Sequence, residues 1–86
     1  MLEINFLPCF IKAYNNLEID LKEEIKEKIS LFKNIKNHKL LKVHKLHGKY
    51  KDRYSFYVNY QTRIVFKFLT KKEVVLLDVG DHDLYK

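Results

Sequence analysis

Histidines and one arginine carry the proton-transfer and phosphate chemistry that this sequence offers. His38, His44 and His47 lie in a basic stretch, His82 lies in a polar tail, and Arg63 lies in the middle of an apolar run. Histidine exchanges protons near neutral pH, and arginine binds a phosphate through two parallel hydrogen bonds. RNA can be cut by its own 2′-OH when a base, a cation and an acid are supplied. These residue types therefore favour metal-free RNA cleavage, a scheme that DNA cannot follow.

Aromatic and basic side chains near these residues are suited to hold the rest of an RNA strand. Tyr57 and Tyr85 are candidates to stack on bases or to orient a hydroxyl. The predicted RNA-binding cations are Lys45, Lys49, Lys51, Arg53 and Lys67. Residues 38–53 hold six Lys or Arg and one acidic residue, and so most of the net charge of +6. Such clustering is typical of polyanion binders, although a solvated loop, a membrane surface or an acidic protein partner remains an alternative.

Other familiar site types find little support in the sequence. Ser30 and Ser55 are the only serines, and neither lies in a Gly-x-Ser-x-Gly motif. Two glycines are too few for a phosphate-binding loop, and the single Cys9 cannot form an intramolecular disulfide. A metal set from His44, His47 and the Asp81-His82-Asp83 cluster is conceivable, but loop residues explain that spacing equally well. We expect no cofactor, and we interpret His38 and His47 as surface residues.

The elements that must position these residues follow from hydrophobic periodicity. The 86 residues are enough for one small domain, spanning 1–86. Alternation predicts strands over 2–6, 54–60, 63–68 and 74–79. Pro8 and the spacing after it predict a helix that ends at Asn15-Asn16, and a second apolar stripe runs from Leu21 to Ile35. The expected fold is a two-layer α+β domain, in which an N-terminal strand and a helical hairpin pack on a mainly antiparallel four-stranded sheet, in the order β-α-α-β-β-β.

The same alternation assigns side chains to the two faces of that sheet. The residues expected to pack under the helices are Phe56, Val58, Ile64, Phe66 and Phe68. Those expected on the opposite, open face are Ser55, Tyr57, Arg63 and Lys67. An arginine within such a strand needs an anion or water to satisfy it, unless it is simply a solvated residue of an amphipathic strand.

No apolar run approaches the roughly 20 residues of a membrane-spanning helix. We therefore expect a cytosolic protein without a membrane partner.

Four segments resemble the C-terminal half of toxins of the RelE/ParE superfamily. They are Leu46-His47-Gly48-Lys49, Tyr54-Ser55-Phe56-Tyr57-Val58, Thr62-Arg63-Ile64-Val65-Phe66 and Val75-Leu76-Leu77-Asp78-Val79-Gly80-Asp81-His82-Asp83. Before Leu46 the likeness lies only in the pattern of elements and in the length. The resemblance implies the toxin of a type II toxin–antitoxin pair, with a neighbouring antitoxin that wraps the basic surface as its partner.

Within that family the resemblance implies an endoribonuclease that cuts mRNA on the ribosome or, in the ParE branch, a DNA gyrase poison. It assigns Arg63 to the scissile phosphate, His82 to acid–base catalysis, and His44 to the place of a second histidine. Ser55 and Tyr57 stand where RelE itself has strand lysines, which favours a histidine-based mechanism. The predicted catalytic set is His82, Arg63, His44, Tyr57 and Tyr85. The third hypothesis is a non-enzymatic member of the family, which only binds nucleic acid or an antitoxin.

Overall fold

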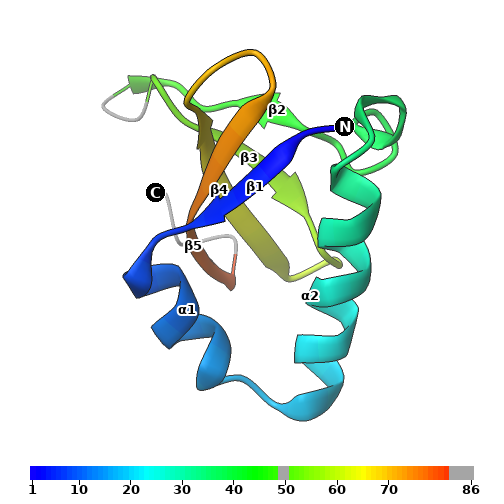
Figure 1. The fold of residues 1–86 in the computed structure, drawn as a ribbon. Coiled ribbons are helices and arrows are strands. Elements are labelled where there is room, and N and C mark those ends of the chain that lie inside the picture. The colour runs from blue at the N-terminus through cyan, green and yellow to red at the C-terminus, as the bar shows by residue number, and fades with distance from the viewer. Residues whose placement is uncertain (49–50, 82–86) are drawn as a thin grey trace.

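A computed structural model describes residues 1–48 and 51–81 (Figure 1). In chain order the elements are β1 (Glu3–Phe6), α1 (Pro8–Asn15), α2 (Ile19–Phe32), a 3-10 turn η1 (Ile35–Asn37), β2 (His44–Lys45), β3 (Tyr54–Tyr57), β4 (Thr62–Phe68) and β5 (Glu73–Asp81). Within the described residues the strands form one sheet in the order β1-β5-β4-β3-β2. Strand β1 runs parallel to β5 and every other pair is antiparallel. No helix in these two ranges is both long and apolar enough to cross a membrane.

The expected two-layer α+β fold is confirmed, but the prediction of four strands is wrong. The fifth strand, β2, consists of His44 and Lys45, which pair with Ser55 and Tyr54 of β3. Two residues are too few to produce a recognisable alternation of apolar and polar side chains. The sequence therefore hides this edge strand inside its basic stretch.

The two helices begin and end for local reasons. Pro8 opens α1 at a position where a helix needs no backbone N–H donor. Helix α2 ends at Phe32, earlier than the apolar stripe predicted, because the chain turns into η1 after Asn34. The Asn34 side chain accepts a hydrogen bond from the backbone nitrogen of Lys36 at 3.0 Å, which starts that turn. As a result Ile35 is exposed rather than part of the helix face.

The main core lies between the helices and one face of the sheet, and Phe32 is its centre. The Phe32 ring is fully buried and lies 4.3 Å from the Phe56 ring and 4.7 Å from the Phe66 ring, measured between centroids. Phe56, Val58, Ile64 and Phe66 are buried in this core, as the alternation predicted. Phe68 shares their face but is 38% exposed at the end of β4.

The opposite face of the sheet is less open than expected. Leu46, Val65, Val75 and Leu77 form a second, smaller apolar cluster. Ser55 has no exposed surface and Arg63 is 7% exposed, so neither side chain projects from an open face as the sequence predicted. A bulge at Val65/Phe66 inserts one extra residue of β5, since Val65 pairs with Asp78 and Phe66 with Leu76. The residue left over is Leu77, which joins the second cluster.

Candidate functional site

Arg63 is a buried cation held by its neighbours on two strands. It lies near the start of β4, directly between Tyr57 of β3 and Gly80 of β5 in the sheet register. Its guanidinium carbon lies 3.5 Å from the centroid of the Tyr57 ring, a close cation–π contact. Its Nη1 donates to the backbone oxygens of Asn59 at 2.7 Å and Thr62 at 3.3 Å. The Nε atom is buried and has no hydrogen-bond partner.

The turn between β3 and β4 is organised by Asn59, which sequence reasoning missed as a site residue. Its Oδ1 accepts from the backbone nitrogens of Gln61 and Thr62, at 2.9 and 2.8 Å. Its Nδ2 donates to a carboxylate oxygen of Glu24 on α2 at 2.7 Å. Because its own backbone oxygen binds Arg63, one asparagine ties the turn, a helix and the buried guanidinium together. An Asn at a strand end followed by a short polar turn was the available signal.

His44 and Lys42 approach Tyr57 from the edge strand and the turn before it. The His44 ring lies 6.4 Å from the Tyr57 ring at a steep angle, and the Lys42 ammonium lies 5.1 Å from the Tyr57 centroid. Nδ1 of His44 is 2.8 Å from the backbone oxygen of Lys42. The structure therefore gathers three predicted site residues, His44, Tyr57 and Arg63, around one aromatic ring. Lys42 belongs to this group although the sequence did not single it out.

Ser55 adds a second unsatisfied polar group to the same face. It lies between His44 of β2 and Val65 of β4 in the register. Its hydroxyl is fully buried and has no hydrogen-bond partner. Buried polar atoms are normally paired, so an unpaired hydroxyl and an unpaired guanidinium nitrogen on one face of the sheet make this face unusual.

The predicted RNA-binding cations that the structure describes are spread over both faces of the sheet and the turn before β3. Lys45 follows His44 on β2, so the alternation of a strand places it on the opposite face. Lys67 shares the face of Arg63, but four residues along β4 place it about 13 Å away. Lys51 is exposed in the turn before β3, and half-buried Arg53 lies 3.9 Å from an oxygen of Asp52.

The other two histidines of the basic stretch differ in their surroundings. The prediction that His38 is a surface residue holds only in part, because its side chain is half-buried. Its ring stacks on Phe32 at 4.7 Å, and its Nε2 lies 2.9 Å from the Phe32 backbone oxygen. His47 is exposed, as predicted. His38 thus packs against Phe32, the last residue of α2.

Three predicted site residues, His82, Tyr85 and Lys49, lie outside the described residues. In sequence, His82 directly follows Asp81, the last residue of β5, and Asp81 pairs with Thr62 next to Arg63. In the part of the chain that the structure describes, no three His, Cys, Asp or Glu side chains are grouped to hold a metal ion. His82 and Asp83 of the conceivable metal set lie beyond that part.

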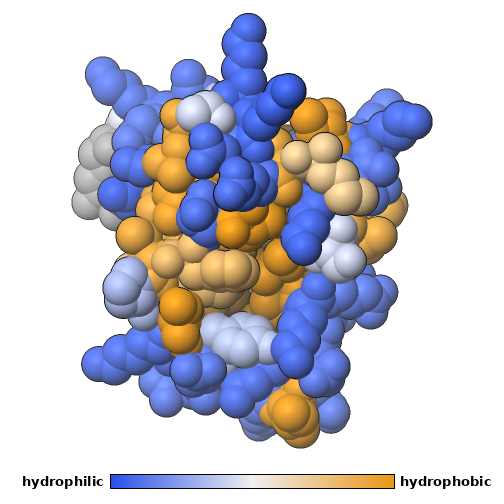
Figure 2. Space-filling model, in the orientation of Figure 1, coloured by the Kyte–Doolittle hydropathy of each residue, from blue (hydrophilic) through white to orange (hydrophobic). Residues whose placement is uncertain are grey.

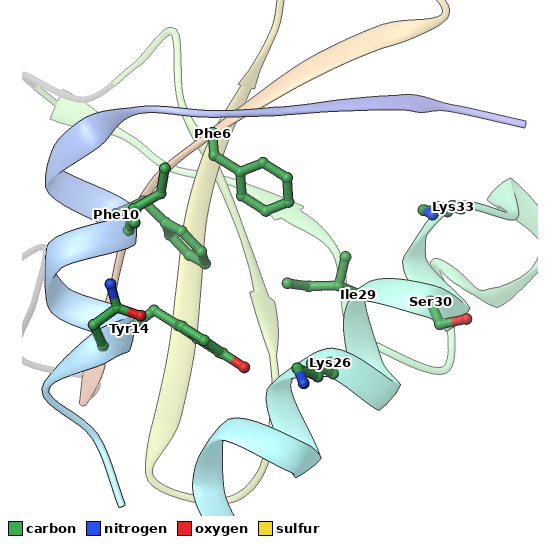
Figure 3. A pocket seen from close by; sticks show the side chains of 9 residues that line it. Phe6, Phe10, Tyr14, Lys26, Ile29, Ser30 and Lys33 are labelled. Carbon is green, nitrogen blue, oxygen red and sulfur yellow. The ribbon is translucent and has the colours of Figure 1, made fainter. Parts of the chain in front are cut away.

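The helix side of the molecule carries a different feature, an apolar groove between α1 and α2 with a volume of about 400 Å³. Figure 2 shows apolar surface gathered in the middle of this face and bordered by hydrophilic residues. In Figure 3, Phe6, Phe10 and Tyr14 point from β1 and α1 toward Ile29 of α2. Phe6 and Ile11 are 44% and 47% exposed there. The charged residues that line the groove, Lys26 and Lys33, are both cationic.

Comparison with known proteins gives a likeness in structure. No protein-family model matches the chain, and no curated protein matches it in sequence. YafQ from E. coli superposes with a TM-score of 0.79 at 19% identity, over 100% of both chains. The YoeB-YefM complex from Staphylococcus aureus gives 0.73 at 19% identity, over 95% of this chain and 98% of that one. The toxin–antitoxin complex RelBE2 from Mycobacterium tuberculosis gives 0.76 at 15% identity, over 94% and 98%.

These neighbours define the class of the fold. The chain is a small α+β domain whose helices cover one face of a mainly antiparallel sheet. Matches over nearly the whole length show that this chain shares the fold of the YafQ, YoeB and RelBE2 structures.

Proposed function

We propose that this protein is the toxin of a type II toxin–antitoxin pair and that it cleaves mRNA, in a ribosome-dependent reaction. The observation that carries the proposal is Arg63, a guanidinium fixed by Tyr57 and Asn59 whose Nε still lacks a partner. A buried, unsatisfied cationic donor favours an anion, and a phosphate diester is the anion that the predicted chemistry needs. The RelE/ParE toxin fold supports the same assignment.

In this proposal each residue has a separate task in transesterification. Arg63 binds the scissile phosphate and stabilises the charge that develops on its oxygens. His44 takes the proton from the 2′-OH as that oxygen attacks phosphorus, and His82, assigned by the resemblance, returns a proton to the leaving 5′-oxygen. Tyr57 keeps the guanidinium flat against its ring and offers its hydroxyl to the substrate. The reaction needs no other nucleophile because the RNA supplies its own.

The test of this activity compares Arg63→Lys with Lys28→Ala on α2, a basic residue of the helix side. Primer extension on translated mRNA after induction should show cuts within codons for the unchanged protein and for Lys28→Ala. Arg63→Lys keeps the charge but not the forked donor, so cleavage should fall about 10²–10³-fold, the usual cost of losing a transition-state donor. His82→Ala should abolish the cuts. Growth arrest with intact message refutes the nuclease, and inhibition of purified gyrase that survives His82→Ala would assign the ParE activity instead.

We propose further that the antitoxin places an amphipathic helix in the groove between α1 and α2. The groove is apolar, and its cationic residues Lys26 and Lys33 suit a helix that carries carboxylates beside its apolar face. The YoeB-YefM and RelBE2 structures are themselves complexes of a toxin with its antitoxin. The partner should be encoded by a neighbouring reading frame.

Two isoleucines give a matched test of that docking site. Ile11 lines the groove at 47% exposure, whereas Ile19 at the start of α2 is 67% exposed and lies outside the groove lining. Ile11→Glu should weaken binding to the neighbouring gene product at least tenfold, because an unpaired carboxylate would be buried in the interface. Ile19→Glu should not. Equal binding by both variants in calorimetry refutes the groove as the docking site.

A further inference from the structure

The turn that precedes β2 contains an unusual backbone conformation. Lys42 has φ of +56°, the only positive φ of a non-glycine residue in the described part of the chain. Left-handed backbone costs a lysine about 1 kcal/mol, so it persists only where its surroundings require it. Here backbone bonds hold both sides of the turn, from Lys42 N to Lys39 O at 3.1 Å and from Val43 N to His38 O at 3.0 Å. The turn is therefore fixed rather than incidental.

This conformation delivers two groups of one residue to the candidate site. The backbone oxygen of Lys42 lies 2.8 Å from Nδ1 of His44, two residues on. Its ammonium lies 5.1 Å from the Tyr57 centroid, the ring against which Arg63 also packs. The backbone oxygen of Leu41, the residue before Lys42, accepts from the backbone nitrogen of Tyr57 at 2.9 Å. This bond continues the pairing of β3 with the segment that precedes β2. The turn thus fixes His44 and Tyr57 relative to each other.

A carbonyl oxygen can only accept a hydrogen bond, so the contact has a definite chemical consequence. Nδ1 of His44 must carry the proton in that bond. In the neutral ring Nε2 is then left as the unprotonated nitrogen, the form that can act as a base. Since a histidine at the site of a phosphate transfer is useful only in the right tautomer, the neighbour that sets the tautomer matters as much as the ring itself.

We propose that Lys42 is a positioning residue: its left-handed backbone fixes His44 in the Nδ1–H tautomer, with Nε2 as the free base, and its ammonium holds the Tyr57 ring beside it. The inference rests on the proposed role of His44 in RNA cleavage. It assigns the atom that exchanges the proton: with Nδ1 bonded to the Lys42 oxygen, Nε2 of His44 is the nitrogen that takes the proton of the 2′-OH in the proposed first step.

Three substitutions at position 42 remove the charge in the same way and differ in the backbone conformation that they favour. Lys42→Gly, Lys42→Ala and Lys42→Val all remove the ammonium, but glycine favours the left-handed region, alanine resembles lysine there, and a β-branched valine disfavours it. The tautomer of His44 is read in the full chain by long-range ¹H–¹⁵N NMR of the imidazole nitrogens, with His44→Gln to assign the signals.

We expect the neutral His44 ring of the unchanged protein to be mainly Nδ1–H, and Lys42→Gly to keep that form. Lys42→Val should shift the tautomer ratio about fivefold toward Nε2–H, the equivalent of one hydrogen bond of roughly 1 kcal/mol. A predominantly Nε2–H ring in the unchanged protein overturns the proposal, and so does the same ratio in the glycine and valine variants. If Lys42→Val does not fold, the unchanged protein and Lys42→Gly still decide the question.

The NMR measurement needs no RNA, so it tests the role of Lys42 independently of the proposed RNA cleavage. An Nδ1–H ring in a protein that leaves mRNA intact would support the positioning role and refute the nuclease. Cleavage by a protein whose His44 is Nε2–H would do the reverse. In a cleaving protein, Lys42→Gly should retain more activity than Lys42→Val at equal folded concentration, since both lack the ammonium and differ only in backbone preference.

Discussion

Replacing Ser55 by alanine should make this protein more stable, which is the opposite of what most buried substitutions do. The Ser55 hydroxyl has no exposed surface and no hydrogen-bond partner. Burying an unpaired hydroxyl costs about 1–3 kcal/mol. Its removal leaves a void of roughly 10–20 Å³, which costs about 0.2–0.5 kcal/mol. The net gain is therefore about 1 kcal/mol or more.

Urea unfolding of the purified protein measures that gain in the free energy of unfolding directly. In thermal unfolding, a gain of about 1 kcal/mol corresponds to a rise in Tm of roughly 4–8 °C for a domain of this size. Ser30→Ala is the control, because Ser30 is exposed on α2 and should change stability by no more than about 0.5 kcal/mol. A loss of about 1 kcal/mol in Ser55→Ala would show that the hydroxyl is hydrogen-bonded in solution and would refute the reasoning.

Two further substitutions test the core and the turn that holds Arg63. Phe32→Ala should cost about 3–5 kcal/mol in urea unfolding, because a fully buried ring that stacks on Phe56 and meets Phe66 edge-on is removed. Tyr60→Ala, at 89% exposure, should cost less than about 0.5 kcal/mol, and similar losses in the two variants would contradict the assigned core. Asn59→Asp should cost about 1–3 kcal/mol at pH 7, because a carboxylate replaces the donor to Glu24 and repels it. Two facing carboxylates favour protonation in the folded state, so this loss should shrink as the pH falls toward 4. Asn34→Asp is the matched control, since that side chain only accepts a hydrogen bond, and an equal, pH-independent loss in both variants would exclude the repulsion.

The sequence was sufficient for the parts of the fold that repeat a pattern. Phe56, Val58, Ile64 and Phe66 recur at every second position of their strands, and the pleat of a strand turns that period of two into a buried face. The two residues of β2 have no such period, so that strand was invisible. The sequence also predicted an open second face, because Leu46 is far from Val65 and Val75 in the chain and their cluster exists only once the strands have paired.

In the candidate site, too, some residues could be predicted from their type, and others depend on how the chain folds around them. Arg63, Tyr57 and His44 were predicted from their chemistry and from a family resemblance, and the register brings them together. Asn59 and Lys42 were missed because they act through backbone oxygens, and any residue type carries one. What selects them is a turn geometry and a positive φ, and neither is written in residue type alone.

The two faces of the sheet allow the two proposed activities to be tested one at a time. The groove is lined by α1, α2 and Phe6 and lies on the helix side, whereas Arg63 and Tyr57 lie on the face of Val65 and Leu77. A helix confined to the groove would therefore be separated from the guanidinium by the sheet. It follows that Ile11→Glu should lose the partner and keep RNA cleavage, while Arg63→Lys should lose cleavage and keep the partner. One variant that lost both with its fold intact would show that the faces are coupled, and the path from Glu24 through Asn59 to Arg63 is where that coupling should be sought.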